Sequence, residues 1–312
     1  MTGISVCYEI VLFDERDYTM DAGRIGNMNF DSRPASDYPL PDLIEILNRG
    51  FESYLVPIHL NLSQFLTMVR KDSIDLTSSR VLLVDEKPSG IALIARRGWA
   101  SRLAAMGIAT DTRGKGAGSW LMERLLQEAR EREDREMVLE VIEQNEAAIK
   151  LYQKFGFQTI RRLIGLIRKD ATEFESDDLH EMDVREMGGL ISQYGLPNLP
   201  WQLSGETIAQ MTPPVRAYCK EQAYIVISDP NAEHVVIWSL LVKPDARGND
   251  LGVEMLRTVI TNHAGKTWHV PAIYPEELGR VFERAGFVRE ELSQWQMKLQ
   301  ISATHPLSLR NL

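Results

Sequence analysis

The stretch Arg113-Gly114-Lys115-Gly116-Ala117-Gly118 decides how this 312-residue sequence is interpreted. It follows an apolar run at 106–109 and precedes a helical pattern that starts near Trp120. Glycines let a backbone turn tightly and present several N–H groups to one anion, and a helix that begins there adds its positive dipole end. The stretch therefore predicts a strand-to-helix turn that holds a phosphate-bearing ligand.

A glycine-rich turn also occurs wherever a backbone must bend or pack closely, so the run alone does not define a ligand. It lacks the Lys-Ser/Thr pair that closes a P-loop, and its spacing differs from the dinucleotide pattern G-x-G-x-x-G. A second motif is needed to choose between these interpretations.

That second motif is the segment 145–157, Asn-Glu-Ala-Ala-Ile-Lys-Leu-Tyr-Gln-Lys-Phe-Gly-Phe. Together the two motifs resemble the GCN5-related N-acetyltransferases, the GNAT superfamily. The residues that carry the resemblance are Arg113, Gly116 and Gly118 in the first motif and Asn145, Leu151, Tyr152, Gly156 and Phe157 in the second. The resemblance implies an α/β (α+β) fold with a mixed, largely antiparallel sheet flanked by helices.

The resemblance also implies acetyl-CoA as co-substrate, with no metal. Backbone amides of the glycine loop and Ser119 would hold the pyrophosphate, and the preceding strand would pair with the pantetheine arm. Asn145 would contact the coenzyme or cap the following helix. The expected coenzyme-binding residues are Met106, Gly107, Ile108, Ala109, Arg113, Gly114, Lys115, Gly116, Ala117, Gly118, Ser119 and Asn145.

Acyl transfer to an amine needs a neutral nucleophile and protonation of a leaving thiolate. By resemblance Tyr152 is the expected general acid, although its helical spacing also suits a core aromatic residue. Glu140 and Glu143, expected on the strand 136–143, are candidate bases, or carboxylates with a structural role. Tyr54 is a candidate for the acceptor pocket.

Apolar periodicity predicts helices near 41–51 and 62–69, strands at 81–84, 91–94 and 101–109, and a turn at 86–90. Residues 1–36 form an N-terminal extension of unassigned role with a candidate strand at 8–13. The catalytic GNAT domain is expected at 37–172, and an acidic linker extends to residue 182.

The same pattern returns after the linker, so the chain contains an internal repeat. Aligning Arg113 with Arg247 also pairs Gly114 with Gly248 and Gly118 with Gly252. The chemistry changes in the second copy: Asp250 replaces Gly116, Phe282 replaces Tyr152, and without a gap Pro275 replaces Asn145. Residues 183–302 are therefore expected to form a degenerate GNAT-like domain, and the fold to be a tandem of two such domains.

Composition limits the class of protein. The chain has 44 acidic and 35 basic side chains and a net charge of −9, which disfavours a nucleic-acid partner and is compatible with a cationic substrate or with solubility alone. Cys7 and Cys219 indicate neither a disulfide framework nor a zinc site. With no predicted leader or membrane span, we expect a cytoplasmic monomer or homodimer.

The sequence thus predicts an acetyl-CoA-dependent N-acetyltransferase whose acceptor is a primary amine of a small molecule or metabolite. A protein or peptide amine is an alternative acceptor. If the chain is not an enzyme, the alternative is a non-catalytic acyl-CoA-binding sensor or a regulatory module.

Overall fold

The computed structural model describes residues 10–11, 28–52, 59–169 and 178–301. They divide into two compact units that are not successive stretches of sequence. The first unit holds the described residues of 9–69, 73–160 and 296–312, and the second holds those of 70–72 and 161–295.

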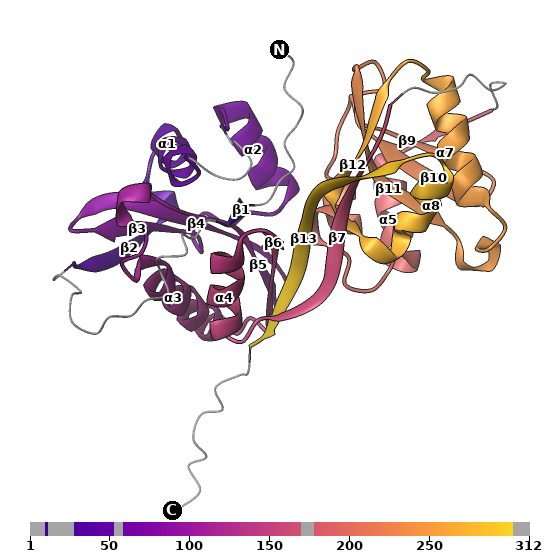
Figure 1. The fold of residues 1–312 in the computed structure, drawn as a ribbon. Coiled ribbons are helices and arrows are strands. Elements are labelled where there is room, and N and C mark those ends of the chain that lie inside the picture. Colours follow the sequence, from indigo (N-terminus) through magenta and orange to yellow (C-terminus); the bar gives the residue numbers. More distant parts are fainter. Residues whose placement is uncertain (1–9, 12–27, 53–58, 170–177, 302–312) are drawn as a thin grey trace, which may run out of the picture. The chain divides into compact units, whose positions relative to one another are not determined.

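The first unit contains one mixed sheet with helices on both faces. Figure 1 shows α1 and α2 on one face and α3 and α4 on the other. Its strands are β1 (Ile10–Val11), β2 (Phe30–Pro34), β3 (Arg80–Val84), β4 (Lys87–Arg97), β5 (Ala100–Ile108) and β6 (Glu136–Ile142). Its helices are α1 (Leu40–Gly50), α2 (Leu62–Lys71), α3 (Ala117–Glu131) and α4 (Glu146–Lys154).

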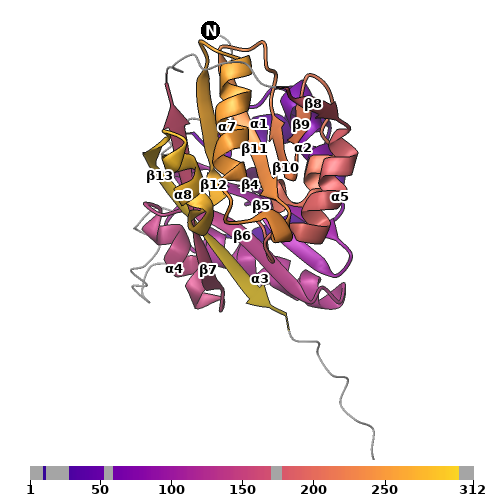
Figure 2. The same cartoon turned by 90° about the vertical axis from the view of Figure 1, so that its right-hand side faces the viewer.

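The second unit repeats this plan. Its strands are β8 (His180–Met182), β9 (Arg216–Lys220), β10 (Ala223–Ile227), β11 (His234–Val242) and β12 (Thr267–Pro275). Its helices are α5 (Val184–Tyr194), α6 (Gly205–Ala209), α7 (Leu251–Asn262) and α8 (Gly279–Arg284). In this unit α7 and α8 cover one face and α5 the other (Figure 2).

Alternation along β10 explains why the second sheet is covered on both faces. Ile225 and Ile227 are buried with α7 and α8, whereas Tyr224 and Val226 are buried with α5 and α6. Successive side chains of a strand point to opposite faces, so an apolar run without polar interruptions needs a helical layer on each side.

Two further strands are each divided between the units. β7 (Gln158–Arg168) follows α4, and its residues from Arg161 onward belong to the second unit, where the described pairs with β12 begin at Leu163. β13 (Val288–Gln300) follows α8, and its residues from Gln296 onward belong to the first unit. There Lys298 forms an ion pair with Glu136 (2.6 Å). Each unit therefore contains part of a strand whose remaining residues belong to the other unit.

The strand registers confirm the internal repeat. A bulge leaves Ala104 as an extra residue on β5, and the alignment that pairs Arg113 with Arg247 places it on Trp238, the extra residue of β11. β5 pairs with β6 over the first three residues of each strand, and β11 pairs with β12 in the same way. The two copies share the bulge and the point at which the parallel pairing stops.

The same registers correct the ungapped alignment of Asn145 with Pro275. With strands β6 and β12 superposed from their first residues, Asn145 falls on Glu276. The shift arises because the segment from the start of the strand to the glycine of the second motif, Gly156 or Gly286, is one residue longer in the first copy. Pro275 is the last residue of β12, not a counterpart of the helix cap.

Other local expectations also change. The turn expected at 86–90 is a two-residue turn at Asp85 and Glu86, both with positive φ, and β4 begins at Lys87. The linker expected up to residue 182 ends in β8, an edge strand that pairs with β9. Most of the candidate strand at 8–13 and Tyr54 lie outside the described residues, but Ile10 and Val11 do form β1.

Candidate active site

The site begins where β5 and β6 diverge. The described pairs between them end at Arg102 with Val138, while β5 continues to Ile108. The bulge at Ala104 lies immediately after the last pair, and bulges bend a strand and interrupt its pairing. Beyond it, β1 pairs in parallel with the edge of β5 at Ala105 and Met106.

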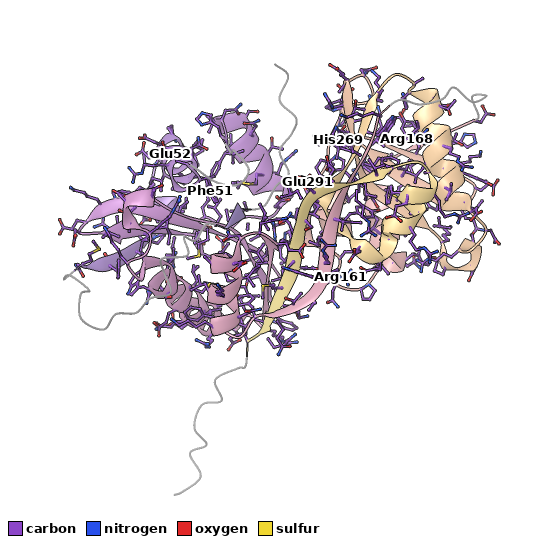
Figure 3. All side chains as sticks on the ribbon, in the orientation of Figure 1. Phe51, Glu52, Arg161, Arg168, His269 and Glu291 are labelled. Atoms are coloured by element: carbon purple, nitrogen blue, oxygen red, sulfur yellow. The ribbon has the colours of Figure 1, made fainter. Side chains whose placement is uncertain are left out.

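Glycines bring the end of α1 onto β5. A Cβ at Gly50 would lie 3.0 Å from a backbone atom of Gly107, and one at Gly107 would lie 2.9 Å from the ring of Phe51. Figure 3 shows Phe51 and Glu52 where α1 ends. Gly107 was expected in the coenzyme site, and its small size also permits this close packing of helix on strand.

The glycine loop adopts the predicted turn. Gly114 and Gly116 have φ values of +74° and +83°, and Gly116 is the N-cap of α3. No side chain caps this helix, whereas Asn145 caps α4 and Asp183 caps α5. The first-turn amides of a helix have no intrahelical acceptor, so an uncapped and exposed turn suits an anion.

Arg113 uses its side chain for structure. Its guanidinium donates to the carbonyls of Ile108 (2.8 Å), Gly50 (3.1 Å) and Glu52 (3.3 Å). Arg247 makes the corresponding bonds in the second unit, to Val242 (3.0 Å) and to the last residue of α5 (2.6 Å). The arginine of the motif thus ties the strand end to the preceding helix.

Two lysines stand at the start of α3. Lys115 donates to the carbonyl of Asp111 (2.7 Å), and Lys154 Nζ lies 3.4 Å from Ser119 Oγ. Sequence reasoning missed Lys154, which lies in the second motif directly before Phe155. Periodicity alone does not show that the end of α4 meets the beginning of α3.

Asn145 and Tyr152 lie on α4. The Asn145 side chain accepts from the amide of Ala148 (3.2 Å), which is the capping role that was one of its two expected functions. Tyr152 is fully buried, with its ring 5.6 Å from that of Phe157. A phenol at this position is shielded from bulk water, so only a group that enters the interior of the unit could exchange a proton with it.

The two candidate bases have different surroundings. Glu140 lies on β6 with its carboxylate fully buried, 3.0 Å from Arg102 Nε, whose side chain is fully buried as well. Glu143 was expected on the strand but lies in the turn after β6, half-buried. The ion pair gives Glu140 a structural role, and Glu143 is the more accessible carboxylate.

Neither a metal cluster nor a membrane-spanning helix is found among the described residues. No group of three or more His, Cys, Asp or Glu side chains there is placed to hold a metal ion. No described helix is both long and apolar enough to cross a bilayer.

This arrangement of a bulged strand, glycine loop, uncapped helix and capped second helix defines an acyltransferase fold of the GNAT type. Residues 40–157 match the model of the acetyltransferase (GNAT) family. The match includes the glycine loop and the second motif, so the resemblance seen in the sequence is confirmed over residues 40–157. It matches none of the curated proteins with which it was compared.

Solved structures share the tandem fold over nearly the whole chain. A tandem GNAT protein from the clavulanic acid biosynthesis pathway is 13% identical with a TM-score of 0.60, covering 88% of this chain and 99% of its own. A GCN5-related N-acetyltransferase from Sphaerobacter thermophilus is 12% identical with a TM-score of 0.59, covering 93% and 97%. One from Anabaena variabilis is 19% identical with a TM-score of 0.57, covering 88% and 73%. These similarities confirm the fold class, two GNAT-type domains in tandem.

Proposed function

We propose that the chain is an acetyl-CoA-dependent N-acetyltransferase whose first unit, which holds most of the catalytic domain expected at 37–172, is catalytic. The observation that carries this proposal is the uncapped start of α3 at Gly116, within the residues that match the family. A Cβ at Gly116 would have no atom within 4 Å, so the turn is open to a ligand. The acceptor is a primary amine of a small molecule or metabolite.

The coenzyme would be held by backbone groups and one cation. Amides of Ala117, Gly118 and Ser119 would meet the pyrophosphate, and Lys154 would add a positive charge beside them. The edge of β5 from Met106 onward would pair with the pantetheine arm. Since β1 pairs with that edge at Met106, bound coenzyme and β1 would compete for the same backbone groups.

The reaction needs proton transfers at two places. The amine nitrogen forms a bond to the acetyl carbon as the carbon–sulfur bond breaks, and the thiolate leaves. Tyr152 would donate its phenolic proton to the thiolate sulfur. Glu143 would accept the proton that the new amide nitrogen loses, directly or through water, because Glu140 is engaged with Arg102.

A Tyr152→Phe variant tests this assignment. Coenzyme A released by the full chain is followed with a thiol-reactive chromophore over a panel of small amines, and acetyl-CoA binding is followed by calorimetry. We expect kcat to fall about 100-fold or more with binding unchanged, since general acid catalysis contributes roughly 10²–10⁴-fold. Tyr274→Phe, which removes a buried phenol hydroxyl from the second unit, is the matched control and should keep full activity.

Other outcomes would support the alternatives. Transfer that proceeds at the wild-type rate in Tyr152→Phe removes the general-acid assignment. Acetyl-CoA binding without transfer to any small amine, but with transfer to peptide amines, favours a protein acceptor. Binding with no transfer to either class favours an acyl-CoA sensor.

A further inference from the structure

The second unit contains a cavity of about 340 Å³ at the place that corresponds to the coenzyme site of the first. It is bounded by the segment after α5, the end of β11 and the start of α7. Its wall is mainly apolar, with lining residues that include Leu196, Leu199, Leu240, Leu251, Leu278 and Val281. Cavities of this size lie within the range of small-molecule pockets.

The mouth of this cavity is closed to anions. Asp250, the αL N-cap of α7, accepts two hydrogen bonds from Arg284, at 2.7 and 2.6 Å. These bonds lower the pKa of Asp250 and raise the pKa of Arg284, so both stay charged and neutralise each other. In the first unit the same two positions are Gly116 and Lys154, which leave a net positive charge.

A carboxylate of the chain therefore stands where a phosphate would bind. The αL conformation at Asp250 is accessible to aspartate, so the exchange for glycine costs little in the backbone. The carbonyl of Asp250 also accepts from the amide of Val253 (2.9 Å), the counterpart of Ser119, and removes a further donor from the helix start.

The backbone amide that corresponds to the start of the expected pantetheine-binding edge is also occupied. The amide of Leu240, the counterpart of Met106, donates to the hydroxyl of Tyr274 (3.0 Å). Burial raises the pKa of Tyr274, so this hydroxyl is neutral at physiological pH. The ring of Tyr274 lies edge-on to Phe282, 5.0 Å between centroids, and is fixed there.

What remains inside is a small, mainly apolar space. Its polar side chains include Ser239, Tyr194 and Tyr274, and the guanidinium of Arg247 at its edge is held by backbone carbonyls. The Asp250–Arg284 pair lies at the mouth. An ion that entered among the leucines would lose its hydration, whereas apolar surface would leave water favourably there.

We propose that this cavity binds an uncharged, mainly apolar small molecule with one hydrogen-bonding group, and that it does not bind acyl-CoA. Ser239 would meet the polar group, and the leucine-rich wall would cover the apolar body. The second unit then carries a ligand site of its own, with a chemistry opposite to that of the anion-binding loop in the first.

The neutral fluorophore N-phenyl-1-naphthylamine tests this site in the full chain. Leu196→Trp, which adds an indole from a segment outside the helices, should weaken binding at least about tenfold by filling the cavity. Leu199→Trp provides a second filling change. Val288→Trp adds the same ring at an exposed position of the same unit away from the cavity lining and should leave binding unchanged.

The readouts separate this proposal from the proposed catalysis. Circular dichroism confirms folding of each variant, and acetyl-CoA calorimetry on the wild type should give one molecule per chain. Absence of probe binding, probe binding that survives both filling variants, or two acetyl-CoA molecules per chain would overturn the proposal. Tyr152→Phe should leave the probe affinity unchanged whatever its effect on transfer.

Discussion

Replacing Glu140 by glutamine should destabilise the first unit much more than it impairs any proton transfer. Glu140 and Arg102 form an ion pair with both side chains fully buried, 3.0 Å between Oε2 and Nε. Glutamine keeps the shape and removes the charge, which leaves a guanidinium in the interior without its carboxylate. Removing one partner of such a pair typically costs about 3–5 kcal/mol, a large share of the roughly 5–15 kcal/mol that stabilises a protein.

The assay is urea unfolding followed by circular dichroism, with the transfer rate measured on the folded variant. Glu143→Gln is the matched control, and we expect its free energy of unfolding to change by less than about 1 kcal/mol while kcat falls. Arg102→Met with Glu140→Leu should recover most of the lost stability, because a well-packed apolar pair often replaces a buried ion pair at no cost.

One result would refute this reasoning. A Glu140→Gln variant that unfolds at the wild-type urea concentration but has lost transfer would make Glu140 a catalytic group and not a structural one. Full activity in Glu143→Gln would equally remove Glu143 as the base.

Three further predictions concern Gly116, β1 and His263. Gly116→Asp should weaken acetyl-CoA binding at least about fivefold, because like charges 4 Å apart repel by about 1 kcal/mol even in water. Gly116→Asn, which adds no charge, should not weaken it. An equal loss in both variants, measured by calorimetry, would contradict the electrostatic reason. Deleting residues 1–27 removes β1 and should tighten acetyl-CoA binding, and an unchanged affinity would show that β1 does not compete. Burial lowers the pKa of His263, and the charge of Lys266 acts in the same direction, so the unfolded chain takes up a proton first as the pH falls below about 6.5. Between that pH and the lower pKa of His263 in the folded chain, the second unit should unfold at progressively lower urea concentrations as the pH falls. His263→Gln should reduce this dependence of unfolding on pH.

Much of the fold was predictable because its elements carry strong local signals. Amphipathic periodicity places α1 to within one residue of its bounds, and the glycine loop marks the start of α3. The repeat was predictable for the same reason, since Arg247 and Gly248 keep the turn whose backbone geometry demands them. These are short-range requirements that a single sequence displays.

The unpredicted features depend on contacts between distant residues. Nothing near Arg102 in the sequence identifies Glu140 as its partner, although the one charge in β5 and the glutamate in the middle of β6 are a usable signal. The position of Lys154 beside Ser119 and that of Tyr274 on the amide of Leu240 require the packed unit. The sequence shows Asp250 in place of Gly116, but it does not show the pairing of Asp250 with Arg284.

The division of β7 and β13 between the two units affects how the chain folds during its synthesis. During synthesis, residues up to Ile160 leave the ribosome long before the segment from Gln296 that completes their unit. Until then the edge of β6 has no permanent partner, and exposed strand edges promote aggregation. Expression of the first half alone would therefore yield an unfinished sheet, and a nascent-chain experiment should find protease resistance of this unit only after β13 has emerged.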